Sequence, residues 1–149
     1  MTDISEHKLA MAESIGLSGS FVSDEHFKDH VHDITDGRGF DVCIEAVGLP
    51  STFQNAIDAA AFRGRVAVVG IGKKNLDFFY SIIQTKELDI MGSRNALPED
   101  FLELIDRVGD RQFDVKSIVS AVYPLDEAPK AFQDFAENGA NLLKVLIRF

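Results

Sequence analysis

The most regular hydrophobic pattern in the chain is a pair of apolar runs, each of which ends in glycine. The first run covers residues 40–48 and the second residues 65–72, and both are rich in β-branched side chains. Continuous apolar runs of this length predict parallel strands that are covered by helices on both faces of a sheet. In open α/β sheets, ligands bind at the carboxyl ends of the strands, where a glycine lets a ligand approach the backbone. The two ends therefore predict the rim of a nucleotide site.

Helical and extended periodicity alternate along the rest of the chain. Helices are predicted over about residues 5–15, 24–36, 51–60, 98–108 and 126–138. Further strands are predicted over about residues 20–22, 88–92, 115–123 and 143–147, with a short packed helix or loop within 73–87. The expected caps are Ser5, Asp24 and, in a capping box with Gln54, Ser51. Ala60 is expected on the buried stripe of its helix, and Phe132 and Phe135 are expected to point inward.

This alternation predicts an α/β fold with a parallel sheet and right-handed crossovers. Apolar and polar residues alternate in the strand at residues 88–92, which indicates a strand at a sheet edge. The first predicted element is a helix, and Asp3 stands where a preceding strand would end. No strand runs into a Gly-x-Gly-x-x-Gly loop, which would seat a pyrophosphate on a helix amino end. The pattern therefore indicates a nucleotide-binding type of sheet without its phosphate loop.

Charge and composition exclude several kinds of partner. The 149 residues include 24 acidic and 15 basic side chains, giving a net charge of −9. Nucleic acids and anionic membrane surfaces both require basic protein surfaces, so neither is expected as a partner. No apolar stretch approaches the roughly 20 residues of a membrane span, and the first residues do not resemble a signal peptide. With Cys43 as the single cysteine, an internal disulfide is excluded, and a reducing, cytoplasmic location is expected.

Several motifs in order resemble the medium-chain, zinc-type alcohol dehydrogenases. They are residues 3–12, 40–48 and 64–70, then Met91-Gly-Ser-Arg-Asn95 and Tyr123-Pro-Leu-Asp-Glu-Ala-Pro-Lys-Ala-Phe132. The match covers essentially the whole chain, and the Gly-Ser-Arg-Asn stretch is similar to the polyol and sugar-acid dehydrogenase branch. The resemblance implies a Rossmann-type dinucleotide-binding domain over residues 1–95 that lacks its first βα unit. Residues 96–149 would form the helix-strand-helix-strand segment that returns to the catalytic domain.

The resemblance also implies a set of NAD-binding positions. In such enzymes an acidic residue that closes the second strand binds the adenosine ribose, and its charge favours NAD over NADP. A basic residue lies near the same ribose, and three strand ends line the adenine, the nicotinamide ribose and the carboxamide. The matching residues are Asp3, Lys8, Ala46, Val47, Gly48, Val69, Gly70, Ile71, Ser93, Arg94 and Asn95.

Each charged candidate also has a structural explanation. Asp3 can instead be an acid that is tolerated near a helix amino end, and Lys8 can be an exposed lysine in the first turn of a helix. Arg94 suits a phosphate or carboxylate, or else a surface ion pair. Glu45 interrupts an apolar strand and needs partners, either near a cofactor or within the fold, and we favour the fold.

No metal or catalytic residue is assigned in this chain. His26 and His30 share a helix face, but His32 does not and no carboxylate completes a ligand set. Cys43, in the middle of a buried strand, is expected to be core packing. In the resembling family, zinc and the proton-relay groups belong to an amino-terminal domain, and zinc polarises the alcohol for hydride transfer to NAD.

The sequence therefore predicts the NAD-binding portion of a zinc-dependent alcohol, polyol or sugar-acid dehydrogenase that is inactive as this chain alone. NAD would bind weakly or not at all, and a small-molecule substrate is expected only in the full-length relative. The alternative is a free-standing Rossmann-like remnant that serves as a binding or oligomerisation module. In either case we expect a homo-oligomer formed through the edge strand at Leu88–Gly92. An unrelated signalling domain is disfavoured because Asp41 and Asp89 do not lie at strand ends.

Overall fold

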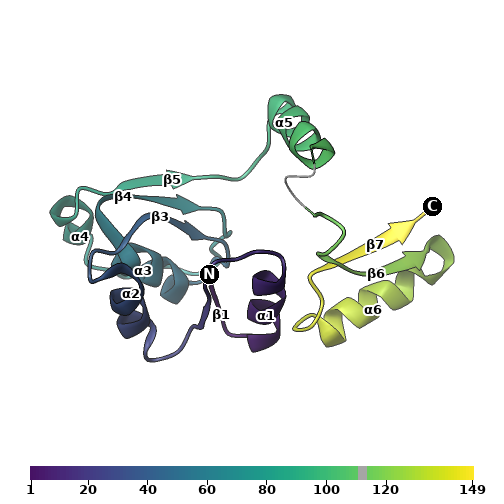
Figure 1. Ribbon diagram of the computed structural model, residues 1–149, viewed down its shortest axis with the longest axis horizontal. Helices are drawn as coiled ribbons and strands as arrows, with labels where there is room; N and C mark the ends of the chain where they lie inside the picture. The colour runs from purple at the N-terminus through teal and green to yellow at the C-terminus, as the bar shows by residue number, and fades with distance from the viewer. Residues whose placement is uncertain (111–113) are drawn as a thin grey trace. The chain divides into compact units, whose positions relative to one another are not determined.

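The computed structural model describes residues 1–110 and 114–149, which form two compact units (Figure 1). Unit 1 contains Met1–Ser23 and Ala96–Phe149, and unit 2 contains Asp24–Asn95. Every helix in the described part of the chain is too short or too polar to cross a membrane.

Unit 2 contains the two glycine-terminated strands of the sequence pattern. Its elements are α2 (Phe27–Thr35), β3 (Phe40–Glu45), α3 (Pro50–Ala59), β4 (Ala60–Val68), α4 (Ser81–Thr85) and β5 (Asp89–Gly92). The strands form a parallel sheet in the order β3-β4-β5, with Glu45 opposite Val68 and Val68 opposite Gly92. The predicted parallel sheet is confirmed, as is the position of the 88–92 strand at an edge. Strand β4 begins earlier than predicted, so Ala60 belongs to the strand and not to the helix.

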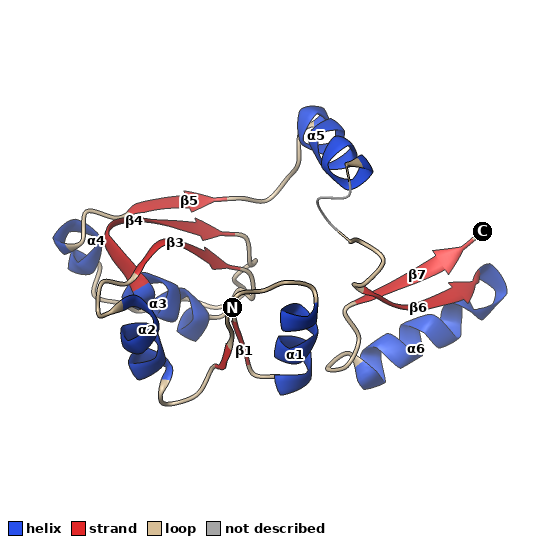
Figure 2. Ribbon diagram, viewed as in Figure 1, coloured by secondary structure: helices blue, strands red, loops and turns tan. Residues whose placement is uncertain are grey.

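Helices cover only one face of this sheet. Cys43 and Glu45 of β3 are buried on that face, as is Val66 of β4, and α3 packs against both strands (Figure 2). On the opposite face, Val42 is 46% exposed and Ile44 is 68% exposed. The prediction of helices on both faces is therefore wrong for this unit, because its described residues supply a single covering layer. The expectation that Cys43 packs in the core is confirmed, and burial raises the pKa of its thiol.

Two of the expected helix caps are wrong. Helix α2 begins after His26, and the Asp24 carboxylate accepts a hydrogen bond from the His26 amide at 2.9 Å, one turn before the helix proper. Helix α3 begins at Pro50, where proline is favoured because a first-turn amide has no partner within the helix. The Thr52 hydroxyl, not Ser51, accepts the amide of Leu49 at 3.2 Å.

The carboxyl end of α3 is bound by a lysine from a distant part of the chain. The Lys86 Nζ donates to the carbonyl oxygens of Ile57, Asp58 and Ala60 at 3.1, 2.7 and 2.8 Å. These carbonyls include groups that a helix end leaves without intrahelical partners. Burial lowers the pKa of Lys86, although Asp58 opposes that shift.

Unit 1 contains two small parallel sheets. Its elements are β1 (Thr2–Asp3), α1 (Glu6–Ser14), β2 (Phe21–Val22), α5 (Pro98–Gly109), β6 (Val119–Pro124), the 3₁₀ turn η1 (Leu125–Glu127), α6 (Ala128–Asn138) and β7 (Lys144–Arg148). Strand β1 pairs with β2, and β6 pairs with β7. The predicted cap of α1 is confirmed, since the Ser5 side chain accepts the amide of Lys8 at 3.3 Å. Asp3 ends β1, so the strand that the sequence required before the first helix is present as two residues.

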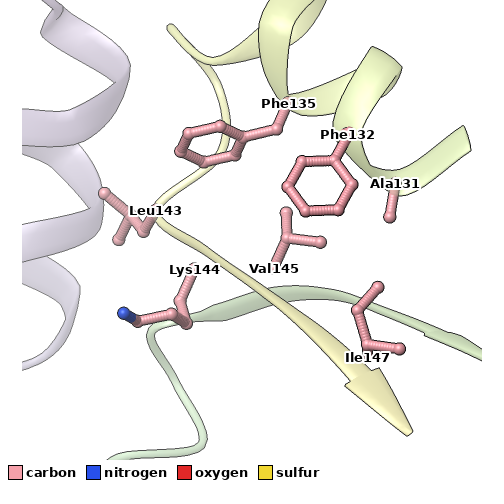
Figure 3. A pocket seen from close by; sticks show the side chains of 7 residues that line it. All are labelled: Ala131, Phe132, Phe135, Leu143, Lys144, Val145 and Ile147. Atoms are coloured by element: carbon pink, nitrogen blue, oxygen red, sulfur yellow. The ribbon is translucent and has the colours of Figure 1, made fainter. Parts of the chain in front are cut away.

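The phenylalanines of α6 lie beside the sheet as predicted, but they are not buried. Ala131 is buried, whereas Phe132 is 75% exposed and Phe135 is 47% exposed. Figure 3 shows both rings beside β7, where they line an apolar hollow of about 230 Å³ together with Val145. A two-stranded sheet is too narrow to cover two large rings, and no second layer of described residues lies over them.

Candidate functional site

The carboxyl ends of β3 and β4 meet at one edge of the unit 2 sheet, because the strands are parallel (Figure 2). We call residues 46–48 after β3 and 69–71 after β4 the strand-end segments. They contain six of the predicted cofactor-binding residues: Ala46, Val47, Gly48, Val69, Gly70 and Ile71. The structure brings these six together at the edge where α/β sheets bind ligands.

Glycine is required in both strand-end segments because the two backbones approach each other closely. A Cβ atom at Gly70 would lie 2.2 Å from the Gly48 amide nitrogen and 2.7 Å from that of Val47. A Cβ at Gly48 would lie 2.6 Å from the Ile71 carbonyl oxygen, and Gly48 also has a φ of 83°. From the sequence alone, these glycines are expected to let a ligand approach the backbone. The structure shows that they first allow the backbone to pack against itself.

Glu45 is the buried charged residue of the described chain, with 3% of its surface exposed. Its Oε1 accepts hydrogen bonds from the amides of Val47 and Gly48 at 2.9 and 2.8 Å, and from the Thr52 hydroxyl at 2.7 Å. Burial alone would raise the pKa of this carboxyl, but the three donors outweigh burial and lower the pKa below its ordinary value. The structural interpretation of Glu45 is confirmed, because its partners belong to the fold.

A small hollow of about 120 Å³ lies beside the strand-end segments. Gly48, Gly70 and Gly72 line it, together with Phe53 of α3 and Lys74. Lys74 was not among the predicted site residues. Its position just after the second glycine-terminated strand is the sequence signal that would have identified it.

The third strand end contains Ser93, Arg94 and Asn95. The Ser93 amide donates to the Val68 carbonyl at 2.8 Å, which attaches the segment after β5 to the end of β4. All three residues are exposed, including the Arg94 side chain. An exposed cation beyond a parallel strand end is available to an anionic ligand.

Asp3 and Lys8 lie in unit 1, at the end of β1 and in the first turn of α1. The Asp3 Oδ1 accepts the Ser5 amide at 2.9 Å, so the carboxylate is held at the amino end of the helix. This hydrogen bond matches the structural alternative given for Asp3, that of an acid near a helix amino end. It occupies one of the two carboxylate oxygens. Lys8 is half-buried.

Residues 1–110 and 114–149 contain no group of three or more His, Cys, Asp or Glu side chains arranged to hold a metal ion. The charged and polar groups of the strand ends instead suit a ligand that binds through backbone amides, carbonyls and isolated charges. A parallel sheet with glycines at its carboxyl ends is typical of Rossmann-type nucleotide-binding domains. The comparisons with known proteins are consistent with this class.

Residues 1–110 match the family model described as zinc-binding dehydrogenase. The chain belongs to this family, and the resemblance found in the sequence is confirmed. A zinc-type alcohol dehydrogenase-like protein of Haemophilus influenzae is 30% identical over 148 residues, which is 97% of this chain and 42% of that protein. A sorbitol dehydrogenase of Halalkalibacterium halodurans is 28% identical over 94% of this chain and 41% of its own length.

Solved structures show the same fold. An alcohol dehydrogenase zinc-binding domain protein from Burkholderia ambifaria has a TM-score of 0.86 at 27% identity, covering 99% of this chain and 40% of that one. L-idonate 5-dehydrogenase from Escherichia coli has a TM-score of 0.86 at 23% identity, covering 99% and 42%. The chain therefore spans about two fifths of the length of the relatives that it matches.

Proposed function

We propose that this chain forms part of the NAD-binding region of a zinc-type alcohol, polyol or sugar-acid dehydrogenase. The observation that carries the proposal is the meeting of two glycine-terminated strand ends at the carboxyl edge of a parallel sheet. Membership of the zinc-binding dehydrogenase family supports it. When bound, NAD supplies the acceptor for a hydride; the residues of this chain would bind and orient it.

The residues present fit the adenosine and ribose parts of such a cofactor. The Asp3 carboxylate ends a parallel strand, and a carboxylate at that position can accept both hydroxyls of a ribose. Its charge would repel a 2′-phosphate, so we propose a preference for NAD over NADP. The strand-end segments and residues 93–95 offer backbone groups and the Arg94 cation to the rest of the molecule.

The affinity of this chain for the cofactor tests the proposal. In an NMR titration of the ¹⁵N-labelled chain, NADH should shift the amides of the strand-end segments with a dissociation constant in the millimolar range. NADPH should bind more weakly, and Asp3→Ser should reduce the difference between the two cofactors. Shifts confined to other parts of the chain would refute the proposed site.

We also propose that the 149-residue chain does not catalyse the reaction by itself, because it corresponds to about two fifths of each relative. The experiment is an assay of NAD-linked oxidation of a panel of polyols and sugar acids with added zinc. Turnover by the purified chain would overturn this part of the proposal without affecting cofactor binding.

An additional proposal is self-association through β5. This strand is at the end of the β3-β4-β5 order, and its Met91 is 50% exposed. An edge strand can pair with a second copy, and a lysine on the edge opposes such pairing. In analytical ultracentrifugation, Met91→Lys should be monomeric and the wild type dimeric. Phe79→Lys, at a side chain that is 83% exposed outside β5, should remain dimeric; a monomeric wild type would exclude the proposal.

A further inference from the structure

Glu45 connects both strand-end segments through separate atoms. Its carboxylate accepts the amides of Val47 and Gly48, while its backbone carbonyl accepts the amides of Val69 and Gly70 at 2.8 and 3.0 Å. One residue therefore fixes four amides, two in each segment. All four belong to residues that the sequence placed against the cofactor.

The carboxylate also lies close to the backbone of the second segment. A Cβ at Gly70 would lie 2.5 Å from the Glu45 Oε2, so this oxygen is directed at the backbone of the second segment. The other oxygen, Oε1, holds the first segment and the Thr52 hydroxyl in the first turn of α3. The carboxylate thus lies between the two segments, with Oε1 hydrogen-bonded to the first and Oε2 near the backbone of the second.

An ionised carboxylate suits this position better than a neutral group. All the recorded partners of Oε1 are donors, and hydrogen bonds to an ionised acceptor are about twice as strong as neutral ones. The amino end of α3 begins at Pro50, where the helix dipole also favours a negative charge. A side chain retained only to fill space would not need a charge that costs free energy to bury.

We propose that Glu45 is a positioning residue, whose carboxylate holds the two strand-end segments in the arrangement that receives the dinucleotide. This inference rests on the proposed function and adds to it a residue that does not touch the ligand. The carboxylate fixes the direction of the amides of residues 47 and 48, and with them the backbone course of the first segment. Loss of the charge should loosen the turn before it unfolds the sheet.

The test compares Glu45→Gln with the wild type and with Asp41→Asn. Glutamine keeps the size of the side chain and one acceptor oxygen but removes the charge. Asp41 is an exposed carboxylate on the same strand that pairs with Arg38 at 2.7 Å, so it controls for the loss of one acidic group. Each ¹⁵N-labelled chain is followed by NMR over an acidic pH range and then titrated with NADH at neutral pH.

We expect the amides of residues 47 and 48 in the wild type to titrate together, at a pH below the ordinary value for glutamate. Glu45→Gln should abolish this titration, accelerate hydrogen exchange at both amides and weaken NADH binding by about tenfold or more, which is about 1.4 kcal/mol. Asp41→Asn should retain the titration and the affinity. A fully folded Glu45→Gln chain with unchanged amide exchange and NADH affinity would overturn the positioning role.

The same measurements also distinguish a failure of this inference from a failure of the proposed function. If the wild-type amides titrate as expected but NADH does not bind, the proposed function fails, and the role of Glu45 toward a dinucleotide fails with it. If NADH binds to the wild type and to Glu45→Gln equally, the function stands and the positioning role fails. Glu45→Asp adds a further control, because the shorter side chain keeps the charge and should restore part of the titration.

Discussion

The substitution Gly70→Ala is the most direct test of the packing between the two strand ends. The added methyl group would lie 2.2 Å from the Gly48 nitrogen, 2.5 Å from the Glu45 Oε2 and 2.7 Å from the Val47 nitrogen. All three distances are shorter than real Cβ contacts, and two of the atoms are backbone. The segment after β3 must therefore move away from β4 to accommodate the methyl group.

The cost of this movement can be worked from the contacts that resist it. Overpacking a close-packed site costs about 1–3 kcal/mol. The Val47 and Gly48 amides are also bound by the Glu45 carboxylate, and each hydrogen bond to a charged group contributes about 1.5–3 kcal/mol. If relief of the clash weakens one of these bonds, the loss is about 3 kcal/mol. For a chain of this length, that corresponds to a melting temperature lower by about 6–12 °C.

Thermal unfolding followed by circular dichroism measures this change, with Gly72→Ala as the matched control. A Cβ at Gly72 would lie 3.9 Å from the nearest heavy atom, the Gly48 carbonyl oxygen, which is an ordinary contact. The control should melt within about 2 °C of the wild type, as expected for a substitution of about 0.5 kcal/mol or less. A Gly70→Ala chain that melts with the control would refute the close approach of the two segments.

Three further predictions concern other contacts within unit 2 or within unit 1. Lys86→Met leaves three carbonyls at the junction of α3 and β4 without their donor, and urea unfolding should show a loss of about 2–4 kcal/mol. Lys28→Met removes the exposed partner of the half-buried Asp58, which keeps its hydrogen bond from Gln54, and should cost about 1 kcal/mol. Because the folded pKa of Glu45 is lowered, its stabilisation is present above the unfolded pKa of about 4.3 and is lost as the pH falls through the folded value. The free energy of unfolding, measured with urea from neutral to acidic pH, should therefore fall less in Glu45→Gln than in the wild type. An equal dependence of this free energy on pH in the two chains would contradict the ionised carboxylate. With Tyr80→Phe, Tyr123 is the only tyrosine, and its hydrogen bond to Asp134 raises its pKa. A pH titration followed by phenolate absorbance should give a pKa for Tyr123 above the ordinary value for tyrosine. Asp134→Asn should lower this pKa.

Local signals were sufficient for most of the secondary structure. Continuous β-branched runs require strands, so β3 and β4 followed from residues 40–48 and 65–72. Pro98 and Ser5 marked helix starts correctly because their effects depend on the first helical turn alone. The capping box predicted at Ser51 was wrong because α3 already begins at Pro50. The side chain that accepts a backbone amide at this helix start is therefore Thr52, which accepts the amide of Leu49.

Burial was predicted less well, because it depends on what covers each face. The apolar run of β3 and the apolar stripe of α6 identify hydrophobic positions, yet Ile44 and Phe132 are exposed. Their exposure depends on the number of layers in each unit, and the side-chain pattern of a single element contains no such information. The domain assignment of residues 1–95 and 96–149 and the individual cofactor contacts stay predictions.

The sequence by itself determined the family, the parallel α/β organisation and the two glycine-terminated strand ends, because each follows from short motifs and their order along the chain. Only the tertiary structure decided the roles of Glu45 and Gly70. The donors to the Glu45 carboxylate lie within seven residues of it. The amides on its carbonyl, and the close approach of Gly70 to Gly48, depend on a second strand that the register of β3 against β4 brings alongside. A glutamate in an apolar run signals that a buried charge needs partners. Which groups of the second strand end lie beside it is set by the packing of β3 against β4.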